Sequence, residues 1–240
     1  MKVSLLMRCV AVGFVALIWP VSSLPHPLPP AQTAASGVGF TADKGKFRIL
    51  QAGSEVGTEE FDFSSSGNAW VAHGEAVLRI PGSGETRSSG QLRVAGDGTP
   101  LHYDWSAGAD KKASGSVTFE DGTAKTLINP VGKDQVHQDF KFTSPRVAIL
   151  DNNLYDQYAM LGRLYDWNAK GVQTFPVLIP QDLTPGTIDV ELLSPLSAEG
   201  GRFDVLRVHT SDLEIQLSFD AKHHLMRLEV PAAKVVIVRQ

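Results

Sequence analysis

The sequence predicts a mainly β protein: a single curved antiparallel sheet or incomplete barrel, with one helix (about 151–168) packed on its concave face. Three observations lead to this fold class. Apolar residues alternate with polar ones in many short segments, as in half-buried strands. Turns containing glycine or proline separate these segments. One stretch changes to a helical repeat, and a lone amphipathic helix needs a sheet to cover its apolar face.

The first predicted strands form a hairpin at the start of the domain. Phe47 and Ile49 alternate with polar residues, and so do Phe61 and Phe63. Gly53 lies between the two segments, where it allows the chain to turn. The alternation places both apolar pairs on the buried face of adjacent strands.

A longer strand is expected at residues 70–80, because apolar or small residues occupy every second position there. Gly74 lies in the middle of that series, which indicates a bulge or a close backbone approach. Further along, Gly122 in the turn 120–122 joins two short strands, since glycine adopts the positive φ angles of hairpin turns.

The helix is predicted from four apolar residues at spacings of four, three and four: Leu154, Tyr158, Leu161 and Tyr165. That spacing places all four on one helical face. Asp151 or Asn152 is expected to cap the first amides of the helix. Gly171 stands where a helix C-terminal glycine belongs.

Strands resume after the helix and continue to residue 238. Residues 235–238 are apolar at every position, so this last strand is expected inside the sheet rather than at an edge. The domain as a whole is expected to hold about ten strands.

The N-terminus has the features of a secretory signal peptide. Lys2 and Arg8 form a positive beginning. Residues 9–21 then form an apolar run that is too short to cross a bilayer core, which needs about 20 residues. Cleavage is expected near Ser23, with a second candidate position near Ala35. The expected location is periplasmic or secreted. The alternative is an uncleaved anchor or an apolar beginning that arose by chance.

Residues 24–44 are rich in proline, alanine and serine and are expected to form a linker. It would join the signal peptide (1–23) to the single β-rich domain (45–240). A proline-rich ligand for a partner is the alternative interpretation. No later segment is long and apolar enough to span a membrane, so none is expected to do so after signal cleavage.

Composition narrows the classes of function. The 240 residues carry a formal net charge of −4 and one cysteine, Cys9, inside the predicted signal peptide. The processed chain is therefore expected to have no disulfide, cysteine-ligated metal or thiol nucleophile. Basic residues are scattered, which argues against nucleic acid as a partner because that requires a concentrated positive field.

No residue pattern indicates a catalytic site, a metal site or a cofactor. The nucleophile-elbow, phosphate-loop and zinc-deaminase patterns each lack a required residue. His223 and His224 are consecutive, so in a strand they would point to opposite faces and not share one metal ion. His137 and Asp139 share a strand face and are able to orient one another, although a solvated surface explains them equally well.

Aromatic residues are the remaining candidates for a ligand-binding site. They can line a cavity between sheet and helix, because tryptophan and tyrosine pack an apolar ligand while keeping a polar group available. Core packing is the competing interpretation. The six candidates are Trp70, Tyr103, Trp105, Tyr155, Tyr158 and Trp167.

The two ends of the domain resemble a known group of proteins. Residues 45–49 form a phenylalanine strand that leads into the G-x-x-V-G-x-E turn at 53–59, and strands at 213–219 and 225–231 close the domain. These segments are similar to uncharacterised secreted bacterial envelope proteins, over about 60 residues of low-specificity strand pattern. That group resembles the periplasmic lipoprotein-carrier fold, a half-barrel around an apolar cavity, which implies a cavity here.

Three functions are consistent with the sequence. The first is an exported, non-enzymatic carrier or binding module for an apolar or amphipathic ligand such as a lipid or acyl chain. The second is an envelope structural or protein-interaction module without a ligand, which predicts a filled core and an unpaired strand or exposed apolar patch. The third is a hydrolase with dispersed carboxylates or histidines, which requires a cleft where such groups converge.

Overall fold

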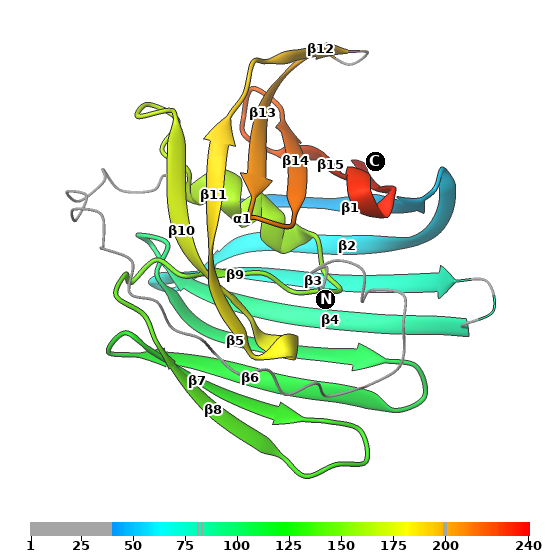
Figure 1. Ribbon diagram of the computed structural model, residues 1–240, viewed down its shortest axis with the longest axis vertical. Helices are drawn as coiled ribbons and strands as arrows, with labels where there is room; N and C mark the ends of the chain where they lie inside the picture. The colour runs from blue at the N-terminus through cyan, green and yellow to red at the C-terminus, as the bar shows by residue number, and fades with distance from the viewer. Residues whose placement is uncertain (1–39, 81, 83, 199–200) are drawn as a thin grey trace.

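The computed structural model describes residues 40–80, 82, 84–198 and 201–240 (Figure 1). The predicted signal peptide, and the predicted linker as far as residue 39, lie outside the described residues. The strands are β1 (Asp43–Gln51), β2 (Ser54–Ser66), β3 (Ala69–Ile80), β4 (Gly84–Ala95), β5 (Pro100–Gly108), β6 (Lys112–Glu120), β7 (Thr123–Asn129), β8 (Val136–Lys141), β9 (Ala148–Ile149), β10 (Val172–Ile179), β11 (Thr184–Leu192), β12 (Leu196–Ala198), β13 (Gly201–His209), β14 (Glu214–Phe219), β15 (Leu225–Val230) and β16 (Val235–Arg239). The helices are α1 (Asp156–Leu164) and the short 3-10 helices η2 (Pro180–Asp182) and η3 (Pro231–Ala233).

One continuous, strongly curved sheet makes up the fold, which confirms the predicted fold class. Its strand order is β8-β7-β6-β5-β4-β3-β2-β1-β16-β15-β14-β13-β11-β10-β9, and β12 pairs with β13. Every pairing is antiparallel except that of β9 with β10. In Figure 1 strands β1–β8 lie one below another, while β10, β11, β13 and β14 run crosswise to them. The sheet therefore forms two limbs, joined where β1 pairs with β16.

The described residues hold sixteen strands, more than the roughly ten expected from alternation alone. The strand β4 illustrates the reason. Apolar alternation was confined to residues 91–94, whereas β4 extends back to Gly84 through serine- and glycine-rich sequence paired to β3. Ladder hydrogen bonds to both neighbouring strands hold such residues extended, although their side chains give no strand signal.

The last strand confirms its predicted position inside the sheet. β16 lies between β1 and β15, with Ile49 opposite Ile237 on one side and Leu228 opposite Ile237 on the other. Ile237 has no exposed surface. The apolar run of this strand thus packs where the two limbs of the sheet meet.

The predicted helix is present but shorter than the expected 151–168. α1 begins at Asp156, with Tyr155 as N-cap residue, and ends before Tyr165, whose backbone is extended. The Asp151 side chain does not cap it, because that carboxylate accepts hydrogen bonds from other groups. Gly171 has a φ of 67° and belongs to a turn that follows the helix.

Helix α1 is enclosed by both limbs of the sheet (Figure 1). The residues 147–150, which include β9, are all buried and run beside it. Eight of its nine residues are buried, Arg163 being the exception. A helix buried on nearly all sides fills the concavity of the sheet, rather than lining one wall of an open cavity.

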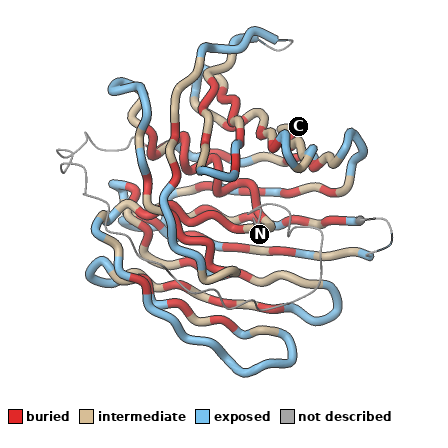
Figure 2. Tube along the Cα trace, in the orientation of Figure 1, coloured by how far each residue is buried: buried red, intermediate tan, exposed pale blue. Residues whose placement is uncertain are grey.

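Two apolar clusters make up the core of the described residues, and buried residues recur along the strands of both limbs (Figure 2). The larger one joins α1 to the C-terminal limb and to β1, through residues such as Phe47, Leu161 and Phe219. The smaller one lies against strands β2–β8 and includes Tyr103 and Val117. Burial of this apolar surface is the main source of the stability of the fold.

The described residues of the predicted linker, 40–44, belong to the folded part. Phe40 is buried and its ring packs edge-on against Phe63, with ring centroids 5.4 Å apart. Asp43 begins β1, and its side chain is 3% exposed. The polar and small residues around Phe40 gave no sign of this packing.

Candidate functional site

A buried carboxylate from the sheet caps the N-terminus of α1. Glu59, on the inner face of β2, has no exposed surface. It accepts the backbone N–H of Tyr155 at Oε2 and that of Asp156 at Oε1, both at 2.7 Å. The first amides of a helix lack partners within the helix and carry partial positive charge, so an anionic acceptor stabilises them.

The carboxyl groups of Glu59 and Asp156 also meet in the interior, where they can share a hydrogen bond only if one of them carries a proton. Burial raises the pKa of Asp156 to about 7. Burial and the charge of Asp156 also raise the pKa of Glu59. Both groups therefore retain a proton to a higher pH than an ordinary carboxyl group does, because burial and their mutual proximity disfavour two charges.

A third buried acid lies just before the helix. Asp151 accepts hydrogen bonds from the hydroxyl of Tyr103 and the side-chain amide of Gln181, and its Oδ1 accepts the N–H of Asn153 at 2.6 Å. Burial raises its pKa. Burial and the nearby Asp151 carboxylate raise the pKa of Tyr103. These bonds explain why Asp151 is not the helix cap that the sequence predicts.

Two cross-strand glycines make room for this polar cluster. At Gly74 the sequence predicts a bulge or a close backbone approach, whereas the group that lies close to it is the side chain of Asp156. Gly74 on β3 lies opposite Gly90 on β4. A Cβ atom on Gly74 would lie 2.7 Å from Oδ1 of Asp156, and one on Gly90 would lie 2.6 Å from the hydroxyl oxygen of Tyr103. Any side chain at either position would collide with these groups.

An ion network holds the other end of α1. Asp43 pairs with Arg163 of the helix at 3.4 Å and with Arg239 of β16 at 2.6 Å. The three side chains are 3%, 8% and 13% exposed. The guanidinium of Arg163 lies over the Phe63 ring, 4.4 Å from its centroid, and that of Arg239 lies over Phe61 at 5.2 Å. Two cations thus compensate one buried carboxylate, and the faces of the two phenylalanine rings stabilise the cations.

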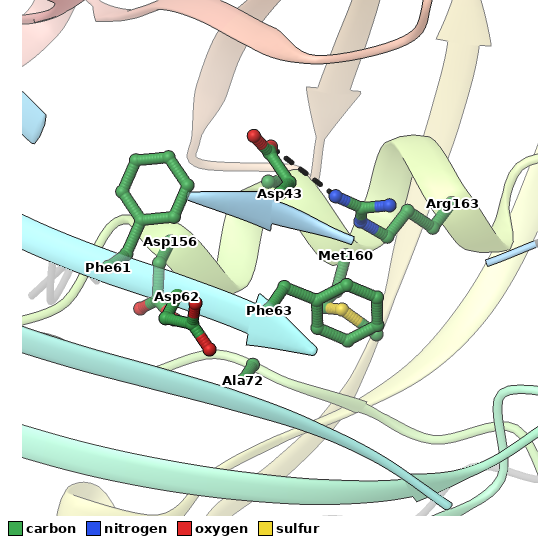
Figure 3. A pocket seen from close by; sticks show the side chains of 9 residues that line it. Asp43, Phe61, Asp62, Phe63, Ala72, Asp156, Met160 and Arg163 are labelled. Carbon is green, nitrogen blue, oxygen red and sulfur yellow. Dashed lines mark hydrogen bonds and ion pairs between the residues drawn. The ribbon is translucent and has the colours of Figure 1, made fainter. Parts of the chain in front are cut away.

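The space between α1 and strands β1–β3 is almost filled. A cavity of about 10 Å³ remains there, lined by Asp43 and Arg163 on one side and Asp156 on the other (Figure 3). That volume is close to the minimum that one water molecule requires. Oδ1 of Asp156 and Nε of Arg163 are buried and have no hydrogen-bond partner. The cavity is thus of the size of a solvent molecule rather than of a lipid.

The six predicted ligand-binding aromatics divide between the two core clusters. Trp70, Tyr103 and Trp105 pack in or against the cluster of strands β2–β8, where Trp70 stacks on Phe63. Tyr155, Tyr158 and Trp167 pack in or against the cluster around α1. Both groups contact protein side chains, and the structure does not bring all six to a common space.

Trp167 occupies a separate position beyond the C-terminus of α1. Its ring is parallel to that of His223, with centroids 4.1 Å apart, and its Nε1 donates to the carbonyl oxygen of Gly162 at 2.7 Å. Burial lowers the pKa of His223. The two histidines of the turn therefore have different roles, since His224 pairs with Asp220 at 3.1 Å.

Sequence reasoning did not identify Glu59 and Asp156 as an interacting pair. A signal for Glu59 was present, because it shares the strand parity of Phe61 and Phe63 and so points inward with them. Asp156 gave no such signal. An acid in the first turn of a helix is usually explained by the helix dipole alone.

A second depression lies on the surface, away from the helix. This open depression of about 550 Å³ lies at the β13–β14 turn, lined mainly by polar residues around Leu213. Among residues 40–80, 82, 84–198 and 201–240, no group of three or more histidine, cysteine, aspartate or glutamate side chains is arranged to hold a metal ion. No helix of the described residues is long and apolar enough to cross a membrane.

The strand β8 forms an open edge of the sheet. It pairs with β7 on one side, and no described strand pairs with its other side. Five of its six residues are exposed, Phe140 being the buried one. Val136 is 38% exposed, and Val131 in the preceding loop is 41% exposed. An unpaired strand with an apolar residue at its end is a site where another chain can add.

The opposite end of the sheet differs. The two-residue strand β9 is completely buried and covers part of β10 inside the fold. The tip of β12 is exposed, but that strand has only three residues and pairs within its own hairpin. Of the sheet edges in the described residues, β8 thus offers the longest accessible one.

The comparisons with known proteins concern the fold alone. No family model and no curated protein matches the sequence. Among solved structures, the fold is similar to that of a β-barrel-like protein of the domain of unknown function DUF1849 from Brucella abortus. The two share 8% sequence identity with a TM-score of 0.53, over 83% of this chain and 94% of that one. This likeness supports a β-barrel-like architecture for the fold.

Proposed function

We propose that this chain is an exported, non-enzymatic structural or protein-interaction module of the cell envelope that carries no ligand in its interior. The observation behind this proposal is the filled concavity of the sheet. The cavity beside α1 measures about 10 Å³, whereas sites for small molecules usually measure about 300–1,000 Å³. Export is supported by the predicted signal peptide at 1–23.

The open edge at β8 supports the second part of the proposal. A strand whose outer N–H and C=O groups are unpaired binds an extended segment of another polypeptide by continuing the sheet. Such an addition needs no cavity and no catalytic residue. The partner proposed here is therefore an extended polypeptide strand.

The carrier function would require the interior to open. Helix α1 would have to leave the sheet, which would break the contacts of Glu59 at one end and of Asp43 at the other. It would also expose buried residues of the helix such as Leu161 and Tyr158. A lipid or acyl chain would have to compensate for these losses, so ligand binding would be coupled to a large rearrangement.

The buried acids also bear on the hydrolase alternative. Asp151, Asp156 and Glu59 converge and their pKa values are raised, as that function requires. However, their exposures are 4%, 6% and 0%, and the space beside Asp156 has the volume of one water molecule. The contacts of the cluster position the helix, and a substrate has no room beside them.

Native mass spectrometry of the processed protein, purified from an exported preparation and followed by solvent extraction, tests this proposal. The mass of the bare polypeptide, alone or as a multiple, is the expected result. A stoichiometric adduct of lipid size that is lost on denaturation would overturn the proposal in favour of the carrier.

A further inference from the structure

We propose that the strand which adds to β8 is β8 of a second copy of this chain, in antiparallel register about a twofold axis at Gln138. This inference rests on the proposed role of the edge as an interaction surface, and it identifies the partner. It follows from three properties of the edge: the direction of its free backbone groups, the order of its charges and the position of its apolar residues.

The free backbone groups belong to the odd-numbered residues. Phe142 donates its N–H to the carbonyl oxygen of Gly122 at 2.8 Å, and the register continues with Phe140 opposite Ala124. In an antiparallel strand the backbone groups of successive residues point alternately to the two sides. His137 and Asp139 therefore direct their N–H and C=O groups toward the open side.

In the register with its twofold axis at Gln138, the free backbone groups of the two copies face each other and can form hydrogen bonds. In that register His137 lies opposite Asp139 of the second copy, and the twofold axis repeats the pair with the roles exchanged. Both are odd-numbered residues, so each pair exchanges two backbone hydrogen bonds. Gln138 meets its own symmetry mate between them.

The side chains are complementary in the same register. On the outer face, the imidazole of His137 lies opposite the carboxylate of Asp139 twice, and opposite charges or hydrogen-bonding groups in such pairs stabilise a sheet. On the inner face, Val136 lies opposite Phe140 of the second copy. This contact would cover Val136, which is one of four large apolar side chains exposed in the described residues.

The neighbouring registers are poorer. A twofold axis at Asp139 would place that carboxylate opposite itself and His137 opposite Lys141, and like charges directly opposite destabilise a sheet. An axis at Phe140 would pair Asp139 with Lys141, but only the last three residues of β8, 139–141, would remain in the overlap. Charged residues usually protect an edge strand from pairing with other chains. On β8 their order instead favours one register over its neighbours.

The association is expected to be weak and concentration-dependent, because one short strand from each copy buries less than a standard interface of about 1,600 Å². Analytical ultracentrifugation of the whole processed protein, up to about 1 mM, should show reversible dimers. A monomer over the complete range would overturn the proposal. That outcome differs from failure of the proposed function, which would appear as a bound lipid whatever the oligomeric state.

Charge variants test the register. His137→Asp would place two carboxylates opposite each other twice, and Asp139→Lys would remove both attractive pairs. Each variant alone should dimerise at least about tenfold more weakly than the wild type. An equimolar mixture of the two variants should recover association. In the mixed dimer the new carboxylate of one copy faces the new ammonium group of the other, and the two unsubstituted side chains form the second attractive pair. Circular dichroism should stay unchanged, since both side chains are exposed. Asp139 lies opposite Lys125 of β7, so a small fall in melting temperature is expected for Asp139→Lys alone.

Lys141, the next charged residue along β8 on the same outer face, provides a matched control. Lys141 lies opposite Gln135 in the proposed register, so Lys141→Gln should leave association unchanged within about twofold. In the register centred on Asp139 it would instead remove a charge opposite His137 and strengthen pairing. A dimer that responds to Lys141→Gln but not to the two charge variants, or a mixture that stays monomeric, would overturn the assigned register.

Discussion

At the N-terminal end of α1, Glu59 and Asp156 meet carboxyl to carboxyl and act on backbone amides, whereas at the C-terminal end Asp43 lies between Arg163 and Arg239. The first joins the helix to β2 and the second joins it to β1 and β16, and both are buried. The first is stable because a proton is present, and the second because opposite charges compensate each other. Two different contacts thus position one helix. Asp43→Asn is expected to lower the free energy of unfolding, whereas Asp156→Asn is expected to raise it at pH 9.

The largest effect is expected at the C-terminal end. Asp43→Asn removes the charge that compensates Arg163 and Arg239 and leaves both guanidinium groups buried with neutral partners. Breaking a buried ion pair in this way typically costs about 3–5 kcal/mol. Urea unfolding followed by circular dichroism should show a loss of this size.

Asp62→Asn is the matched control for that experiment. Asp62 lies on β2 near the same cavity but is exposed. Substitution of an exposed side chain usually changes the free energy of unfolding by less than about 0.5 kcal/mol. Equal losses for Asp43→Asn and Asp62→Asn would show that the ion network does not hold the helix.

A smaller loss is expected from Glu59→Gln at the N-terminal end. A glutamine oxygen can accept only one of the two amide hydrogens of Tyr155 and Asp156, so the other is left without a partner. A buried donor without a partner costs about 1–3 kcal/mol. Glu60→Gln, at the adjacent exposed position paired with Lys46, is the control and should have little effect on the urea midpoint. An unchanged midpoint for Glu59→Gln would exclude the capping role.

The fold was largely predictable because its signals are local. Alternation at Phe47, Ile49, Phe61 and Phe63 identified a strand pair, and the spacing from Leu154 to Tyr165 identified the helix. The exact helix start was not predictable, since Asp151 is a good cap by sequence. In the folded chain that carboxylate is instead occupied by Tyr103 and Gln181.

The two anchors of α1 were not predictable because they depend on how the sheet curls. Glu59 and the amide that it caps at Asp156 are 97 residues apart, and Asp43 and Arg239 are 196 residues apart. Local periodicity gives the face on which a side chain lies, but not which distant residue faces it. The helix also showed only one apolar stripe, while the two limbs of the sheet bury nearly all of it.

The pH dependence of stability should distinguish the two ends. The pKa of Asp156 rises from 3.8 to about 7 on folding. A raised pKa of an acid means that its contribution is fully present below about pH 4 and is lost as the pH rises toward and above 7. Wild-type stability should therefore fall between pH 5 and pH 9 by roughly 1–3 kcal/mol.

Asp156→Asn should remove most of that fall. Asparagine stays neutral and can donate to Glu59 as the protonated acid does, so the variant should be the more stable protein at pH 9. The measurement is the urea midpoint at several pH values. A variant less stable than the wild type at every pH would show that the pair does not share a proton. The opposite sign from Asp43→Asn is the sharpest test of the contrast between the two ends.

The smallest expected effect is the coupling between the two anchors. Asp156 and Arg163 are seven residues apart on α1, about 10 Å along the axis, and both line the cavity of about 10 Å³. The buried helix residues Tyr158 and Leu161 pack against the sheet between them. If this packing holds the helix in place when one anchor is lost, Asp43→Asn and Glu59→Gln should be additive within about 0.5 kcal/mol. A double variant that loses at least about 1 kcal/mol less than the sum would mean that α1 detaches as a unit once either end is free. A helix that detaches in this way would open the interior, which the carrier function requires and the closed structure lacks. Comparing the two single variants with the double variant therefore also measures how firmly the interior is closed.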